Sequence, residues 1–125
     1  MSNFHLSFFF YGTLKEDGNL HYLIEEYLLS APIKVKAFGR LYKSPFGNWP
    51  VMVIDNKKQV YGELYQVKFE ILKVIYQEEL IYGYTLKLID IYNLDGSFIT
   101  KALVCLWDNQ VLKSDVIISG EWINN

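Results

Sequence analysis

The feature that most constrains this chain is an aromatic run near its start that ends abruptly at a glycine. Residues 8–11 are Phe-Phe-Phe-Tyr, and Gly12, Thr13 and Leu14 follow. Aromatic side chains pack well on the pleated, half-buried surface of a sheet, so the run predicts a buried strand. Gly12 adopts backbone angles that other residues avoid and lets another molecule approach the main chain. The N–H groups after the strand can therefore point together at a negatively charged oxygen.

This short motif also has a simpler interpretation. A glycine at the end of a strand often serves only the change of direction, and short motifs match by chance in many sequences. An anion-binding loop at 11–14 and a turn without a ligand are both compatible with these residues alone. The rest of the chain has to separate the two interpretations.

Length and composition favour one globular domain. The chain has 125 residues, of which 51% are hydrophobic and 17% aromatic. A chain of this length buries a core without help from a metal or a disulfide, so we expect a single domain over residues 1–125. The formal net charge is −2, and the cations between residues 34 and 43 are spread along one expected strand. This pattern gives no electrostatic support to nucleic-acid binding.

The cysteine and histidine content argues against several kinds of site. Cys105 is the single cysteine, so neither a disulfide framework nor a thiolate metal site is expected. Its apolar neighbours at 103–107 predict a core strand in which it acts as a small apolar residue. His5 and His21 lie far from Cys105 in the sequence and have no carboxylate motif around them, so we expect no catalytic thiolate and no zinc site.

The chain carries no pattern that directs it to a membrane. Its first residues lack the basic region, long apolar core and cleavage site of a signal peptide. No apolar run is long enough to span a bilayer. We therefore expect a cytoplasmic protein without membrane association.

Apolar periodicity predicts two helical segments. Residues 19–29 carry apolar side chains at spacings of three and four, with Glu25 and Glu26 on the other side, and Pro32 follows. A second helical stretch is expected at 68–79. The buried side of this second stretch is predicted to consist of Phe69, Leu72 and either Ile75 or Tyr76.

Strand patterns cover most of the remaining chain, at 35–42, 51–54, 60–67, 84–94 and 97–107. Gly39 interrupts the first of these segments and indicates a bulge or a close approach of backbones. Asp95-Gly96 between the last two segments is the strongest hairpin signal in the chain. Because helices and strands do not alternate and the last strands form a long antiparallel hairpin, we expect an α+β domain with a curved or barrel-like sheet.

Five motifs occur in an order that is more specific than any one of them. In chain order they are Tyr11-Gly12-Thr13-Leu14; Gly39-Arg40-Leu41-Tyr42 with Trp49-Pro50 about ten residues on; Val60-Tyr61-Gly62-Glu63-Leu64-Tyr65; the segment 72–79 with Tyr84 after it; and Ile118-Ser119-Gly120-Glu121-Trp122. Together they resemble the gamma-glutamylcyclotransferase-like family, in particular its small bacterial members. The resemblance covers nearly the whole chain. It implies a small mixed barrel with flanking helices and a cavity beside the 11–14 loop.

The resemblance also implies a reaction, an intramolecular aminolysis of the lyase or acyltransferase type. The α-amino group of a γ-glutamyl amine or small γ-glutamyl peptide attacks its own γ-carbonyl and gives 5-oxoproline and a free amine. One carboxyl can deprotonate the ammonium and then protonate the departing amine, and burial among apolar rings would raise its pKa toward this task. No metal or cofactor is implied.

By its position in the motif, Glu79 best matches the family's catalytic glutamate. Glu78 is the alternative if the register differs by one residue, and Glu63 on the expected strand 60–67 is a third candidate. The resemblance implies that substrate is bound by Tyr11, Gly12, Thr13, Leu14, Gly39, Pro50 and Tyr84.

Three positions depart from the family's pattern. Tyr76 replaces a common aspartate, Leu80 a common glycine, and Leu86 an arginine that is often present. The departures leave the fold prediction intact but bear on catalysis. A second hypothesis is therefore a catalytically inactive domain of the same fold that binds a small ligand or a partner. A third, a structural domain without a ligand, predicts a cavity filled by the protein's own side chains.

Overall fold

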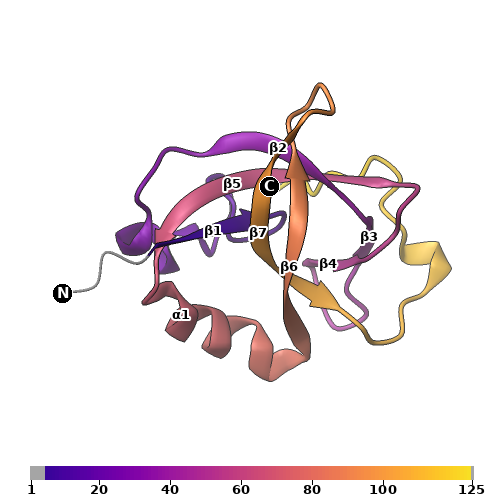
Figure 1. Ribbon diagram of the computed structural model, residues 1–125. Coiled ribbons are helices and arrows are strands. Elements are labelled where there is room, and N and C mark those ends of the chain that lie inside the picture. Colours follow the sequence, from indigo (N-terminus) through magenta and orange to yellow (C-terminus); the bar gives the residue numbers. More distant parts are fainter. Residues whose placement is uncertain (1–4, 125) are drawn as a thin grey trace.

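Seven strands, one α-helix and four short 3-10 helices make up the computed structural model, which describes residues 5–124 (Figure 1). The strands are β1 (His5–Phe10), β2 (Ile33–Phe38), β3 (Arg40–Lys43), β4 (Pro50–Val53), β5 (Gln59–Lys68), β6 (Tyr84–Tyr92) and β7 (Phe98–Trp107). The α-helix is α1 (Ile71–Glu78), and the 3-10 helices are η1 (His21–Leu23), η2 (Glu25–Tyr27), η3 (Leu80–Tyr82) and η4 (Lys113–Asp115).

Five of the strands close into a barrel in the order β1-β5-β2-β6-β7. The ring closes where β1 pairs with β7 in parallel, with Phe8 opposite Leu103, while the other neighbours in the ring are antiparallel. Strands β3 and β4 form a separate two-stranded sheet, and α1 lies across the lower side of the barrel in Figure 1. The prediction of an α+β fold with a mixed, barrel-like sheet is confirmed.

The aromatic run of β1 contributes to two hydrophobic clusters. Phe8 and Phe10 belong to a cluster that includes Ile71 and Ile75 of α1, whereas Phe9 belongs to a second cluster with residues from the other barrel strands. This division follows from the alternation of side chains along a strand. Residues 8–10 of β1 therefore lie between α1 and the second cluster and are buried on both faces.

The prediction of a continuous helix over 19–29 is wrong, because the structure forms only the single turns η1 and η2 there. The apolar stripe is nevertheless partly buried, with Ile24 fully enclosed. Leu28 takes an extended backbone conformation, and the Leu29 N–H donates to the Gln66 carbonyl at 2.8 Å. The segment ends early because pairing with the edge of β5 replaces the next helical hydrogen bonds.

The second predicted helix exists but is shorter, and its buried face differs from the prediction. Ile71 and Ile75 are fully buried, whereas Phe69 and Tyr76 are exposed. Residues four apart share a face of a helix, so a helix that begins at residue 71 turns this pair inward. The prediction that Phe69 forms part of the buried side is therefore wrong.

Gly39 divides the predicted strand 35–42 into β2 and β3, which belong to different sheets. A Cβ atom at Gly39 would lie 2.5 Å from the Met52 side chain and 3.0 Å from the Val53 carbonyl oxygen. This contact confirms the predicted close approach of backbones. Gly96 in the predicted β6–β7 turn has a φ of +97°, and the hairpin prediction is confirmed as well.

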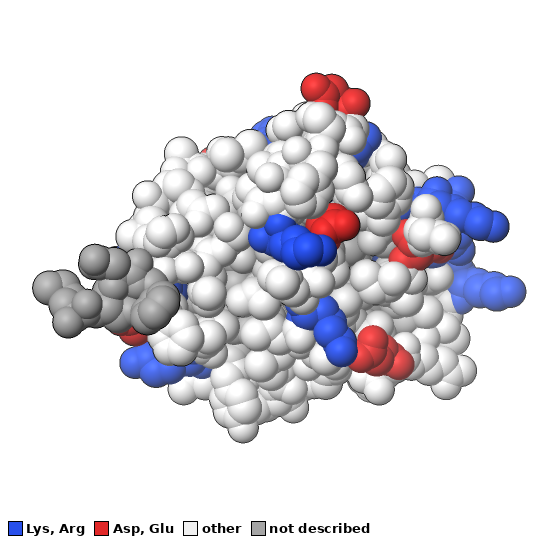
Figure 2. All heavy atoms as spheres, in the orientation of Figure 1, with Lys and Arg blue, Asp and Glu red and all other residues white. Residues whose placement is uncertain are grey.

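Charged side chains are scattered over the face shown in Figure 2, and the blue cations on it form no continuous patch. Among the described residues, no helix is long and apolar enough to cross a membrane.

Candidate active site

A cavity of about 270 Å³ opens beside the end of β1. It is lined by residues 8–14, Asn19, Leu20, Asn48, Trp49, Pro50, Glu78, Glu79, Tyr82, Tyr84 and Cys105. Most of these side chains are apolar or aromatic, as in most small-molecule sites. The carboxyls of Glu78 and Glu79 are the charged groups among them. The side chains of the described residues leave this space open, contrary to the expectation for a purely structural domain.

Glu79 reaches the cavity because it continues the buried face of α1. Ile71, Ile75 and Glu79 follow one another at intervals of four, so their side chains lie on one side of the helix. The Glu79 N–H donates to the Ile75 carbonyl at 2.9 Å, and the Glu79 carbonyl accepts from the Tyr82 N–H at 3.0 Å. Glu79 is thus the junction between α1 and η3. Glu78, the last residue of α1, borders the same cavity.

Burial raises the pKa of the Glu79 carboxyl to about 8, and the neighbouring Glu78 charge contributes to the rise. Removal from water disfavours the charged form of a carboxyl, and a second negative charge acts in the same direction. No cation opposes these effects, because the ion pairs of the described residues are formed by Asp55 and Asp90 elsewhere. The Glu79 carboxyl can therefore gain and lose a proton close to neutral pH.

Two tyrosines fix the walls of the cavity. The Tyr11 hydroxyl donates to the Cys105 carbonyl at 2.6 Å, and the Tyr84 hydroxyl donates to the Pro50 carbonyl at 2.9 Å. Burial, followed by neighbouring negative groups that include Glu79, raises the pKa of both phenols above the ordinary value. Both hydroxyls thus stay protonated and act as donors. They connect the end of β1 to β7 and the start of β6 to β4.

Cys105 is a buried residue of β7, as its apolar sequence neighbours predict. Burial, with a further contribution from Glu79, raises the pKa of its thiol. A thiol in these surroundings is a poor nucleophile, since the thiolate is the reactive form. Although Cys105 forms part of the cavity wall, its chemistry agrees with a packing role.

The loop after β1 brings main-chain donors to the cavity. Within the described part of the chain, the N–H groups of Gly12, Thr13 and Leu14 have no hydrogen-bond partner. Successive N–H groups without partners are available to bind an oxygen of a ligand. A Cβ atom at Gly12 would lie 2.7 Å from Pro50 Cγ, so the glycine allows the loop to lie directly against β4.

The structure gathers most of the candidate residues around this cavity and places two elsewhere. Those that line it are Tyr11, Gly12, Thr13, Leu14, Pro50, Tyr84, Glu78 and Glu79. Gly39 does not line the cavity: it packs against Met52 at the start of β3, away from the other candidates. Glu63 lies on β5, where its Oε1 accepts hydrogen bonds from the Glu16 N–H at 2.8 Å and the Tyr65 hydroxyl at 3.2 Å. It supports the loop and does not border the cavity.

Several lining residues were not predicted from the sequence. They are Asn19, Leu20, Asn48, Trp49, Tyr82, Cys105 and the three phenylalanines of β1. Trp49 belongs to the Trp49-Pro50 motif and Asn48 precedes it, so their proximity to Pro50 in the sequence is a signal that indicates both residues. Asn19 lies in a segment without a motif, and Tyr82 lies between the motif residues Glu79 and Tyr84; the fold brings the two to one cavity.

Comparison with protein families identifies the relatives of this chain. A family described as "Gamma-glutamyl cyclotransferase, AIG2-like" matches residues 8–124. The chain belongs to this family. The resemblance seen in the five motifs is thereby confirmed. A comparison with curated proteins finds no match.

Solved structures share the fold. An AIG2-like protein from Mus musculus aligns with a TM-score of 0.79 at 18% identity, over 95% of this chain and 88% of that one. YkqA from Bacillus subtilis aligns with a TM-score of 0.73 at 24% identity, over 95% of this chain and 40% of that one. An uncharacterized protein from Pyrococcus horikoshii aligns with a TM-score of 0.67 at 24% identity, over 93% of this chain and 88% of that one. This chain thus spans less than half of YkqA. At these identities the likeness shows the fold alone.

Proposed function

We propose that this family member is a γ-glutamyl cyclotransferase, which converts a small γ-glutamyl amine or peptide to 5-oxoproline and a free amine. One observation carries the proposal: the Glu79 carboxyl, whose pKa is raised to about 8, and the unpaired N–H groups of residues 12–14 border the same small cavity. A base and a set of oxygen-binding donors are the two elements that this ring closure requires.

In the proposed mechanism, the N–H groups of the loop bind oxygens of the γ-glutamyl moiety, and ionised Glu79 removes a proton from the α-ammonium group. The free amine attacks the γ-carbonyl carbon and forms a new C–N bond. Glu79 then donates the proton to the departing nitrogen as the original C–N bond breaks. The ring nitrogen loses its second proton to Glu79 as the ring is completed, and Glu79 passes this proton to the released amine. Glu79 is left ionised, and the products are 5-oxoproline and the amine as its ammonium ion.

The pKa of Glu79 suits both proton transfers. A chain N-terminus has an ordinary pKa of about 8, and the carboxylate beside the substrate's α-ammonium raises the pKa of that ammonium somewhat further. The pKa of Glu79, about 8, is near enough that the first transfer costs little free energy. The nucleophile and the carbonyl belong to one molecule, and a small apolar cavity favours the folded conformer in which they meet.

The three departures from the family's pattern do not remove groups from the cavity. The side chain of Tyr76 is exposed on α1, whereas Leu80 and Leu86 pack against the first hydrophobic cluster. None of the three lines the cavity. The departures thus leave the lining of the cavity unchanged. An inactive binding domain of the same fold is the alternative to the proposed enzyme.

The test is to incubate the purified protein with a panel of γ-glutamyl amines and γ-glutamyl amino acids and to measure both 5-oxoproline and the released amine. We expect the two products to form in equal amounts. We expect Glu79→Gln to lower kcat by about 100-fold or more, because a general acid–base group contributes on this order. Glu78→Gln is the matched control and should keep most of the activity. Binding of 5-oxoproline without turnover of any substrate would instead establish the inactive binding domain.

A further inference from the structure

The loop at the cavity is held by its carbonyl groups. The Gly12 carbonyl accepts hydrogen bonds from the Lys15 N–H at 3.1 Å and from Asn124 Nδ2 at 3.2 Å. The Thr13 carbonyl accepts from the Leu20 N–H at 3.1 Å, and the Leu14 carbonyl contacts His21 Nδ1 at 2.8 Å. The Lys15 carbonyl accepts from the Gly18 N–H at 2.8 Å. A trans peptide group is planar, so its N–H points away from its C=O. A hydrogen bond to the Gly12 carbonyl therefore also orients the Thr13 N–H.

Two of these contacts come from side chains, and the more distant is Asn124, 112 residues from Gly12. The Trp122 Nε1 donates to Asn124 Oδ1 at 3.2 Å, which assigns the amide so that its nitrogen faces the loop. That nitrogen also donates to Asp17 Oδ1 at 3.0 Å. One amide group thus contacts both the start of the loop and its middle.

The segment that carries Asn124 is itself fixed to the barrel. The Gly120 carbonyl accepts from the Tyr61 N–H of β5 at 2.8 Å, and Trp122 packs against the second hydrophobic cluster. The Lys15 ammonium donates to the Trp122 carbonyl at 2.8 Å. Asn124 is therefore presented from a rigid base, and it contacts the loop on its carbonyl side.

We propose that Asn124 is a positioning residue, which holds the Gly12–Thr13 peptide in the orientation that leaves the Thr13 N–H free to bind an anionic oxygen of the ligand. The assignment of that oxygen to a γ-glutamyl carboxylate rests on the proposed function. The positioning role itself rests on the hydrogen bonds between Asn124 and the loop.

The experiment compares two ring compounds that differ by one carboxylate. The affinities of 5-oxoproline and of 2-pyrrolidinone are measured by NMR titration of the full chain and of Asn124→Ala. We expect Asn124→Ala to weaken 5-oxoproline binding about 10-fold, since a hydrogen bond to a charged group is worth roughly this factor, and to leave 2-pyrrolidinone binding unchanged. In turnover, KM should rise while kcat stays within about twofold of the wild-type value.

Asn93→Ala is the matched control, because among the described residues the Asn93 side-chain amide donates to the exposed Ser97 hydroxyl in the β6–β7 turn and does not reach the cavity loop. It should change neither affinity. An equal loss for both ring compounds in Asn124→Ala would show a purely structural role and overturn the proposal. Unchanged binding of 5-oxoproline would overturn it as well.

A second readout separates this proposal from the proposed function. If the wild-type protein binds neither ring compound, the cyclotransferase proposal fails, but amide hydrogen exchange still tests the positioning role. The Lys15 N–H is bonded to the same Gly12 carbonyl as Asn124. Its protection should fall in Asn124→Ala and not in Asn93→Ala. Unchanged protection would show that Asn124 does not hold the loop.

Discussion

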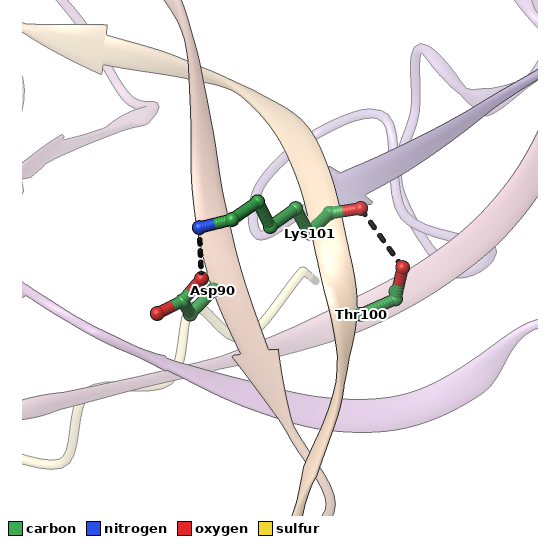
Figure 3. Close-up of polar contacts among 3 residues, drawn as sticks. All are labelled: Asp90, Thr100 and Lys101. Carbon is green, nitrogen blue, oxygen red and sulfur yellow. Dashed lines mark hydrogen bonds and ion pairs between the residues drawn. The ribbon is translucent and has the colours of Figure 1, made fainter.

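Two hollows in the described part of the molecule each carry a pair of carboxyls, and the two pairs differ in their partners. The cavity beside β1 has Glu78 and Glu79. A surface hollow of about 180 Å³ next to β6 has Asp55 and Asp90. In the surface hollow both acids are paired, Asp55 with Arg40 Nε at 3.2 Å and Asp90 with Lys101 Nζ at 2.6 Å, the latter shown in Figure 3.

The difference shows that the environment, and not the residue type, decides what a carboxyl can do. Each of the two aspartates forms an ion pair at the surface. An acid in an apolar cavity without a cation holds its proton up to a much higher pH, as Glu79 does with a pKa of about 8. The cavity is therefore suited to proton transfer, and the surface hollow is not.

The largest expected effect concerns stability. The pKa of Glu79 is about 8 in the folded protein and about 4.5 when unperturbed, so the folded state binds the proton more tightly. Its contribution to the free energy of unfolding is complete below pH 4.5 and is lost as the pH rises to about 8. Glu79→Gln should thus match the wild type at pH 4 and exceed it by about 5 kcal/mol at pH 9.

Urea unfolding at both pH values measures this difference. Asp90→Asn is the control, because its carboxylate lies in the paired surface hollow, and it should not show the same increase with pH. A wild-type stability that rises between pH 5 and 8 relative to Glu79→Gln would contradict the assignment of a desolvated acid.

The sequence predicts the barrel-like α+β architecture, which is confirmed, and it selects candidate residues that meet at one cavity. The aromatic run of β1 and the Asp95-Gly96 turn are local signals whose physical basis the fold preserves, because strand burial and turn geometry act over a few residues. Glu79 follows from its position in the motif, and the spacing of four from Ile75 brings it to the cavity, while its catalytic role stays a prediction.

Predictions that depend on distant contacts could not be made from the sequence. The helix over 19–29 failed because the Leu29 N–H bonds β5, a partner that no local pattern reveals. Gly39 was assigned to the site although its missing Cβ serves the Met52 contact. Asn124 has no motif of its own, and its contact with Gly12 exists only once the chain has folded.

A second prediction concerns a variant that adds a cation to the cavity, so that its carboxyl is paired as the acids of the surface hollow are. Glu78 raises the pKa of Glu79, so Glu78→Lys should reverse this effect and lower that pKa by about one unit or more. The acidic limb of the pH profile of kcat/KM, expected near pH 8 in the wild type, should move to lower pH. Because ionised Glu79 is then a weaker base, kcat should fall about 10-fold.

Glu78→Gln is the matched variant and should shift the limb by less than Glu78→Lys. A limb that stays in place in both variants would show that Glu79 does not control the rate. The measurement is a pH series of initial rates with a saturating and a limiting substrate concentration.

A third prediction concerns the leaving amine. The Glu78 carboxyl has no cationic partner among the described residues and borders the cavity, so a positively charged amine should be favoured over one that carries a second carboxylate. We expect about a 3- to 10-fold preference in kcat/KM for γ-glutamyl amines with a distal ammonium over γ-glutamyl amino acids, which corresponds to about 1 kcal/mol. Glu78→Gln should reduce this preference, and an unchanged ratio would show that Glu78 does not select the substrate.

The smallest expected effect belongs to the surface hollow. Lys101 and Asp90 face each other across β6 and β7, and both side chains are largely exposed. An exposed ion pair is screened by water and restricts two flexible side chains, so Lys101→Met should lower the free energy of unfolding by less than about 1 kcal/mol and leave 5-oxoproline formation unchanged. Urea unfolding at low and high salt measures the first quantity. If Lys101→Met altered the pH profile of turnover, the two hollows would be coupled, and pairing of the surface acids could no longer be treated as independent of the proton transfer at Glu79.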